Sequence, residues 1–99
     1  MLGGRKMLRV TLTFKGNELK VYDTDKKEIT IGRHEDNDIA LDDIAISKKH
    51  VRIYRKDASY WIEDMDSNNG TLLNGQRVRT AQLADGDTIQ VVKFDLKVS

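Results

Sequence analysis

Three polar clusters in this chain carry side chains that could bind an anion. Arg33 follows one run of alternating apolar residues, Ser47 and Lys48 precede another, and Asn68 and Asn69 stand in the stretch SNNGTLLNG. Hydroxyl, amide and ammonium groups all donate hydrogen bonds, and arginine and lysine add positive charge. A plainer interpretation stays open for each cluster, because surface arginine is common and a basic rim is an ordinary way to begin a strand.

The chain offers no evident catalytic set. It has two histidines and no cysteine, and no acidic residue stands at a spacing typical of a triad or a metal site. His50 falls at the start of a predicted strand and is expected to be a hydrogen-bonded structural residue. We therefore expect a binding protein that is not an enzyme and that uses no cofactor and no metal ion.

Composition restricts the class of protein further. Ninety-nine residues predict one small domain, and 17 Lys and Arg against 16 Asp and Glu leave a net charge of only +1. This balance indicates neither a nucleic-acid surface nor a membrane surface. The absence of cysteine and of a signal peptide favours a cytoplasmic location.

The polar clusters must be positioned by strands, because short alternating runs separated by turn residues fill the chain and no window predicts a long amphipathic helix. The expected strands are 8–14, 19–22, 28–31, 39–41, 50–55, 59–64, 71–73, 88–92 and 94–98. Counting the briefer runs gives about nine to eleven strands, which predicts an all-β sandwich or barrel. We expect one domain over residues 8–98, preceded by a tail at 1–7 that is native or left by cloning.

Taken together, the polar loops resemble those of a forkhead-associated (FHA) domain, a phosphothreonine-binding β-sandwich. The matching segments, in the family's order and spacing, are GR (32–33), NDIALD (37–42), SKKH (47–50), Asp64, SNNGT (67–71), NG (74–75) and LADGDTI (83–89). The resemblance extends over nearly the whole chain. It implies a sandwich of two sheets and about eleven short strands, with the binding loops at one end.

The resemblance also implies roles for individual residues. Arg33 is expected to contact the phosphate, and Ser47 to donate its hydroxyl and its backbone N–H. Lys48 and Asn68 are expected to make further phosphate or peptide contacts, and Asn69 to hold the backbone of the ligand. Lysine stands where the family often has arginine, and lysine lacks the planar fork that binds phosphate through two hydrogen bonds.

The remaining members of the expected site support it without touching the ligand. By the resemblance, Gly32 and His50 shape the loops, and Gly70 gives the backbone room. Within SNNGTLLNG we expect the first four residues to face the ligand. Asn74-Gly75 is expected to be a tight turn with Gly75 at positive φ.

The function implied is recognition of phosphothreonine on partner proteins in Ser/Thr kinase signalling. The expected partner is a phosphothreonine protein or peptide. The domain is expected to belong to a larger protein or to be regulated by a Ser/Thr kinase. The alternative is a sandwich of the same fold that serves as a phosphate-independent scaffold or self-association domain. A nucleic-acid-binding domain is the weakest candidate, because Tyr54, Tyr60 and Trp61 form no stacking row between basic residues.

Overall fold

The alternating runs form two packed sheets. In the computed structural model, which describes residue 2 and residues 7–99, the chain forms eleven strands and no helix. The strands are β1 Leu8–Phe14, β2 Asn17–Thr24, β3 Glu28–Gly32, β4 Ile39–Ala40, β5 Val51–Lys56, β6 Ser59–Asp64, β7 Thr71–Leu73, β8 Gln76–Val78, β9 Thr80–Gln82, β10 Thr88–Val91 and β11 Phe94–Val98. The expected two-sheet β-sandwich is confirmed.

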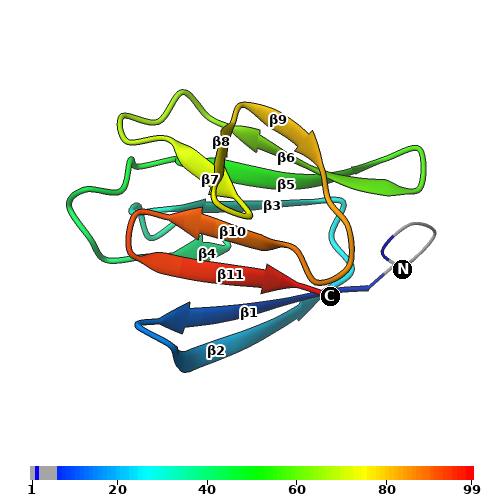
Figure 1. The fold of residues 1–99 in the computed structure, drawn as a ribbon, viewed down its shortest axis with the longest axis horizontal. Helices are drawn as coiled ribbons and strands as arrows, with labels where there is room; N and C mark the ends of the chain where they lie inside the picture. The colour runs from blue at the N-terminus through cyan, green and yellow to red at the C-terminus, as the bar shows by residue number, and fades with distance from the viewer. Residues whose placement is uncertain (1, 3–6) are drawn as a thin grey trace.

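The sheets have six and five strands. The first has the order β2-β1-β11-β10-β7-β8, and the second has the order β4-β3-β5-β6-β9. Figure 1 shows the C-terminus at one end of the sandwich, whereas the loops that follow β3, β4 and β6 gather at the other end. The topology therefore brings three separate loops of the chain to one end.

Period-two alternation builds the core, because successive side chains of a strand face opposite sides of the sheet. Leu8, Val10 and Leu12 of β1 are buried, as are Ile29 and Ile31 of β3. Each sheet thus presents an apolar inner face to the other. The buried hydrophobic cluster is Leu2, Leu8, Val10, Leu12, Ile29, Ile31, Ile39, Leu41, Ile46, Val51, Ile53, Tyr60, Ile62, Leu83, Ile89, Val91, Leu96 and Val98.

Two strands were not among the predicted ranges. β8 and β9 are three residues each, are separated only by Arg79, and lack an apolar alternation. β8 pairs with β7 in one sheet and β9 pairs with β6 in the other. Their strand conformation depends on these partners, because short polar segments have little strand preference of their own.

Several predicted strand limits are also wrong by one or two residues. β2 runs from Asn17 to Thr24 and not only over 19–22, because β1 pairs with it along its length. β5 begins after His50, whose N–H donates to Ile31 O and whose C=O accepts from Met65 N–H. β10 ends before Val92, which takes a φ of 57° in the turn to β11.

The expected N-terminal tail, residues 1–7, stays a prediction, although one of its residues packs on the core. Residues 1 and 3–6, including the glycine pair at 3–4, lie outside the described residues. Leu2 is buried and belongs to the core cluster, although the sequence assigns it to the tail. A single leucine forms no alternating pattern, so only its tertiary packing reveals its role.

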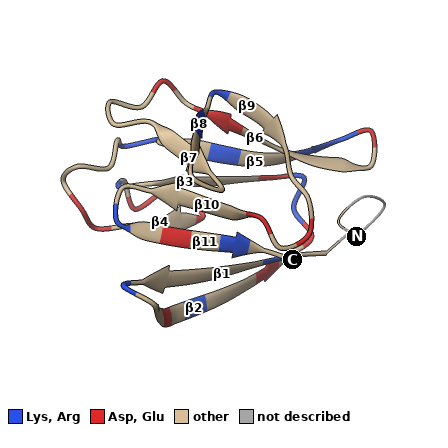
Figure 2. Cartoon of the chain, viewed as in Figure 1, with Lys and Arg blue, Asp and Glu red and all other residues tan. Residues whose placement is uncertain are grey.

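Charged residues are distributed over the whole molecule. Figure 2 shows Lys and Arg interspersed with Asp and Glu on the strands and loops of both sheets. None of the described residues belongs to a helix that could span a membrane.

Two hairpin turns share one backbone geometry. Asn74-Gly75 joins β7 to β8 with φ values of 50° and 85°, so the expected tight turn is confirmed. Asp57-Ala58 joins β5 to β6 with φ values of 51° and 65°. Both turns need positive φ at both central residues, as type I′ hairpins do, and glycine suits the second position best. Ala58 therefore carries a Cβ where the backbone disfavours one.

Replacing Ala58 with glycine is expected to stabilise the protein by about 1 kcal/mol, because the left-handed conformation costs alanine about that much. Urea unfolding of wild type and Ala58→Gly measures the change. The matched control is Gly75→Ala, which introduces the same cost and should destabilise by a similar amount. A lower midpoint for Ala58→Gly would contradict this interpretation of the turn.

Candidate functional site

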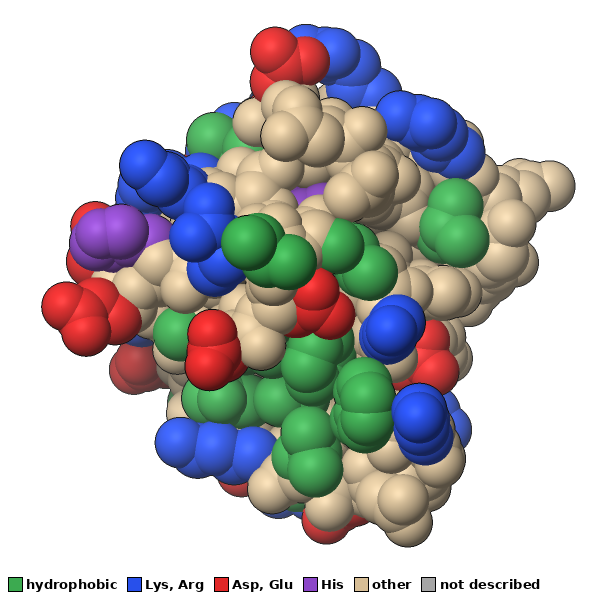
Figure 3. Space-filling view, turned by 90° about the vertical axis from the view of Figure 1, so that its left-hand side faces the viewer, with side chains coloured by type: hydrophobic (Ala, Val, Ile, Leu, Met, Phe, Trp, Pro, Cys, Tyr) green, Lys and Arg blue, Asp and Glu red, His purple; other side chains and the backbone are tan. Residues whose placement is uncertain are grey.

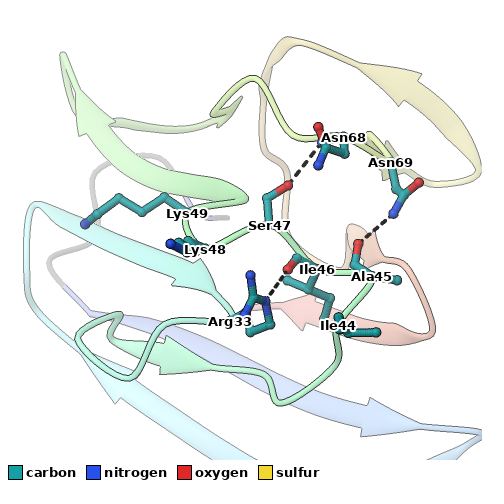
Figure 4. A pocket seen from close by; sticks show the side chains of 9 residues that line it. All are labelled: Arg33, Ile44, Ala45, Ile46, Ser47, Lys48, Lys49, Asn68 and Asn69. Carbon is teal, nitrogen blue, oxygen red and sulfur yellow. Dashed lines mark hydrogen bonds between the residues drawn. The ribbon is translucent and has the colours of Figure 1, made fainter.

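The loops after β3, β4 and β6 line a pocket of about 410 Å³ at one end of the sandwich. Figure 4 shows side chains from all three loops around it. The pocket contains each of the five residues that the sequence nominates for ligand contact, namely Arg33, Ser47, Lys48, Asn68 and Asn69. The fold thus brings together residues that lie up to 36 positions apart in the chain (69 − 33).

The backbone N–H and the Nε of Arg33 are hydrogen-bonded within the protein, whereas, in the part of the chain that the structure describes, its terminal nitrogens are not. Its backbone N–H donates to Ser47 O over 3.0 Å, and its Nε donates to Ile46 O over 3.1 Å. Among the described residues, its two terminal nitrogens have no hydrogen-bond partner. The guanidinium is therefore held in place with two nitrogens available to an anion.

Ser47 joins the second loop to the third. Its Oγ accepts a hydrogen bond from the backbone N–H of Asn68 over 3.1 Å, which leaves the hydroxyl proton available for donation. The backbone N–H of Ser47 donates to His50 Nδ1 over 3.2 Å. The structure therefore gives this N–H an internal partner in His50, and its expected contact with a ligand stays a prediction.

His50 lies buried between the loops, with no exposed surface. Because Nδ1 accepts from Ser47, the other nitrogen carries the proton, and Nε2 donates to Gly70 O over 2.7 Å. Both ring nitrogens are thus occupied by the backbone of the second and third loops. His50 sets the relative position of these loops and is not placed to act as a base.

Gly32 permits a close approach of the first two loops. A Cβ on Gly32 would lie 2.3 Å from Lys48 O and 2.9 Å from Asn37 Nδ2. Asn37, which is 7% exposed, donates through Nδ2 to His34 O and to Lys48 O, each over 2.7 Å. Gly32 and Asn37 together hold the backbone of Lys48 against the end of β3.

Gly70 has a similar role in the third loop. It takes a φ of +81°, and a Cβ there would lie 2.8 Å from Arg77 Cζ. The guanidinium of Arg77 therefore packs directly against the glycine. The backbone conformation favours a residue without a side chain, whereas the flexible Arg77 side chain could move away from an added Cβ.

Asp64 organises the interior of the third loop. Its Oδ1 accepts from the hydroxyls of Ser67 and Thr71 over 2.6 and 2.7 Å, and its Oδ2 accepts from Ser67 N–H over 3.0 Å. Burial raises the pKa of the Asp64 carboxyl, but these three hydrogen bonds outweigh burial, so the pKa lies below its ordinary value. The ionised carboxylate is therefore part of the folded loop.

Asp64→Asn is expected to cost about 2 kcal/mol of stability at pH 7, because the amide puts a donor where Ser67 N–H needs an acceptor. Since folding lowers the pKa of Asp64, the carboxylate stabilises the wild type above the unfolded-state pKa, and this contribution is lost as the pH falls below about 4. Urea midpoints between pH 3 and pH 7 should therefore fall less steeply for Asp64→Asn. The exposed Asp66→Asn serves as the control, and equal pH profiles for wild type and Asp64→Asn would contradict the prediction.

Four further residues line the pocket that sequence reasoning did not nominate. They are Ile44, Ala45, Ile46 and Lys49. Lys49 stood within the basic cluster SKKH, so its charge was a usable signal. The other three precede Ser47 in the same loop, and their apolar side chains gave no sign of a surface role.

The electrostatics of the pocket favour an anion. Its lining includes the cations Arg33, Lys48 and Lys49, and it includes no acidic residue. Among the described residues, no group of three or more His, Asp or Glu side chains is placed to hold a metal ion. The arrangement can bind a small anion through neutral and charged donors.

The fold and the pocket together define a β-sandwich recognition module that presents preformed hydrogen-bond donors from the loops at one end. The FHA domain model matches residues 29–92, well over half of the chain. The chain belongs to the FHA domain family.

Curated relatives support the same membership. Over 72 residues, or 73% of this chain, it is 39% identical to the oxoglutarate dehydrogenase inhibitor of Corynebacterium diphtheriae and to the glycogen accumulation regulator GarA of Mycobacterium tuberculosis. The matched segment is 50% of the first relative and 44% of the second. The match thus extends over no more than half of either relative.

A solved structure agrees over almost the whole fold. EmbR of Mycobacterium tuberculosis, determined in complex with a low-affinity phosphopeptide, superposes with a TM-score of 0.86 at 27% identity. The superposition covers 96% of this chain and 24% of EmbR. The sandwich described here therefore forms a small part of that longer protein.

Proposed function

We propose that this chain binds phosphothreonine on partner proteins and acts as a reader in Ser/Thr kinase signalling. The observation that carries the proposal is the pocket in which Arg33, Ser47 and Lys48 converge and whose lining holds no acidic residue. A phosphothreonine carries about −1.5 to −2 charge at pH 7 and three strong acceptor oxygens. The pocket offers cations and neutral donors to match them.

Each pocket residue has a role in this proposal. Arg33 binds the phosphate through its two terminal nitrogens, Ser47 donates its hydroxyl, and Lys48 adds an ammonium group. Asn68 adds an amide donor. Asn69 already donates from Nδ2 to Ala45 O over 2.6 Å, and its amide oxygen is left to accept from a peptide N–H. Gly32, His50 and Gly70 hold the loops in this arrangement.

The expected strength is that of a reversible reader. Charge-assisted hydrogen bonds contribute roughly 1.5–3 kcal/mol each. Three or four of them, less the cost of ordering an extended peptide, give about 8 kcal/mol, which corresponds to micromolar affinity. The phosphopeptide bound to EmbR, a protein that contains the same sandwich, supports this mode of binding.

The same proposal covers the biological setting. The chain is a binding module and not an enzyme, and it works in the cytoplasm, which agrees with its lack of cysteine. It functions within a longer protein or under the control of a Ser/Thr kinase. The named activities of the two relatives, inhibition of oxoglutarate dehydrogenase and regulation of glycogen accumulation, suggest a metabolic regulator as the setting.

Titration with three matched peptides tests the proposal. A phosphothreonine peptide is expected to bind in the micromolar range, its phosphoserine twin about fourfold more weakly for loss of one buried methyl, and the threonine peptide not measurably. Isothermal calorimetry gives the three affinities. Equal affinity for the phosphorylated and unmodified peptides would overturn the proposal. Light scattering that shows self-association without phosphate would favour the scaffold alternative.

A further inference from the structure

The Asn-Gly pairs at 69–70 and 74–75 are open to a reaction between an asparagine side chain and the backbone. The glycine nitrogen attacks the side-chain carbon Cγ and gives up its proton, the bond from Cγ to Nδ2 breaks, and ammonia leaves. Water then opens the cyclic imide to aspartate or isoaspartate. Glycine makes the attack easiest, because it has no Cβ to hinder the approach and restricts the backbone least.

Hydrogen bonds hold both reacting groups of the first pair. Asn69 Nδ2, the leaving group, donates to Ala45 O over 2.6 Å, and Gly70 N–H, the nucleophile, donates to Ser67 Oγ over 2.9 Å. Gly70 is also buried. The attack requires the Asn69 side chain to turn toward the nitrogen and a base to take the Gly70 proton, so each hydrogen bond must break first.

The Ser67 hydroxyl is oriented for this contact by Asp64. Its Oγ donates to Asp64 Oδ1 over 2.6 Å, which leaves its lone pairs to accept from Gly70. The Thr71 hydroxyl donates to the same Oδ1 over 2.7 Å but, in the described part of the chain, makes no hydrogen bond to Gly70. Of the two hydroxyls that share this carboxylate, the one on Ser67 therefore restrains the nucleophile.

The second pair is held in a different way. Asn74 Nδ2 donates to Asp87 Oδ1 and Asn74 Oδ1 accepts from Thr88 N–H, each over 2.9 Å. Asn74 and Gly75 are both exposed, and neither hydrogen bond involves Ser67. Asn74-Gly75 is therefore an internal reference, in the same molecule, for a reaction that Ser67 does not control.

We propose that Asn69 is a site of self-modification by deamidation, and that Ser67 sets the rate of this reaction in the folded protein. The product places a carboxylate in a pocket whose described lining holds three cations and no acidic residue. Figure 3 shows this end of the molecule, where Lys and Arg side chains lie beside uncharged polar surface. A carboxylate cannot donate to Ala45 O and repels a phosphate, so the modified chain loses phosphothreonine binding; this consequence rests on the proposed function.

Mass spectrometry of folded protein kept in a mildly alkaline buffer measures the reaction, because replacement of the amide by a carboxylate raises the mass. Trypsin releases residues 57–77 as one peptide that contains both Asn-Gly pairs. Its fragment ions give the rates at Asn69 and Asn74 separately. The ratio of the two rates is the readout, so a general loosening of the fold that speeds both reactions does not obscure it.

Ser67→Ala is expected to speed the reaction at Asn69 about fivefold, as loss of one neutral hydrogen bond implies, and to leave Asn74 unchanged. Thr71→Val is the matched control, because it removes the other hydroxyl that donates to Asp64 and leaves the bond to Gly70 N–H in place. Its ratio of rates should equal that of the wild type.

Equal ratios in Ser67→Ala and Thr71→Val would overturn the proposal. A second measurement needs no variant and decides the matter if Ser67→Ala does not fold. Asn69 is expected to react at least about tenfold more slowly in the folded wild type than in the same chain unfolded by urea, because two hydrogen bonds must break. Equal rates in the folded and unfolded chain would also overturn the proposal.

Two variants test the consequence for binding. Asn69→Asp reproduces one product of the reaction, whereas Asn69→Ala removes the amide without adding charge. Titration with a phosphothreonine peptide is expected to give an affinity about tenfold lower for Asn69→Asp than for Asn69→Ala, and equal affinities would contradict the loss of binding. The reaction rates are measured without peptide, so failure of every phosphopeptide to bind the wild type would contradict the proposed function and leave the assignment of Asn69 and Ser67 in place.

Discussion

Arg33→Ala is expected to lower the affinity for a phosphothreonine peptide at least about thirtyfold, or ~2 kcal/mol. The reason is that the two terminal nitrogens of Arg33 are held toward the pocket by the bond from Nε to Ile46 O. Alanine removes the fork that matches two phosphate oxygens and leaves Lys48 and Lys49 as point charges. Calorimetric titration of wild type and variant with the same peptide measures the loss.

Two further variants separate the effect of the Arg33 guanidinium's geometry on affinity from the effect of its positive charge. Arg9→Ala removes one positive charge from β1, where Arg9 Nε pairs with Asp23 Oδ1 over 2.8 Å, outside the pocket, and should leave the affinity nearly unchanged. Arg33→Lys retains the charge but loses the fork, so an intermediate affinity is expected. Equal affinities of wild type and Arg33→Ala, with the same unfolding midpoint, would sink the assignment of Arg33 to phosphate.

Gly32→Ala is expected to have the largest effect on stability, a loss of about 3 kcal/mol or more. The added Cβ would lie 2.3 Å from Lys48 O, a backbone atom that cannot rotate away. Relief requires the second loop to move from the end of β3, which would also strain the hydrogen bond from Asn37 to Lys48 O. Urea unfolding measures the loss of stability. A variant that shows no cooperative unfolding transition would represent the largest possible loss.

A second glycine supplies the control. Gly16 takes a φ of +79°, but a Cβ added to it would meet nothing within 4 Å, so Gly16→Ala should cost only the backbone strain of about 1 kcal/mol. The comparison therefore isolates the steric contact at Gly32, whose φ lies outside the left-handed region. A Gly32→Ala variant no less stable than Gly16→Ala would refute the close approach of the two loops.

Local pattern predicted the long strands well. β1, β6 and β11 match their predicted ranges, because each has an alternating apolar face that the core buries. The same rule failed at β8 and β9, which are short and polar and become strands only by pairing with β7 and β6. Strand pairing is a contact between distant segments, so a local pattern cannot report it.

The two Asn-Gly pairs of SNNGTLLNG also differ in whether the local sequence predicts their structure. Asn74-Gly75 is a hairpin turn whose residue types alone predict positive φ. Asn69-Gly70 lies in a loop that passes from β6 in one sheet to β7 in the other. Its shape depends on Asp64, on His50 and on the packing of Arg77 against Gly70. Identical dipeptides therefore serve different purposes, which the sheet topology decides.

The sequence by itself determined the strand-rich fold and the donors of the pocket, because alternation and side-chain chemistry are local properties of the chain. Only the tertiary structure decided how those donors are used. It directed the N–H of Ser47 to His50, occupied Asn69 Nδ2 with Ala45 O, and placed Ile44 in solvent beside Arg33. Each of these outcomes depends on hydrogen bonds and packing between loops that meet only when the two sheets have closed on a common core.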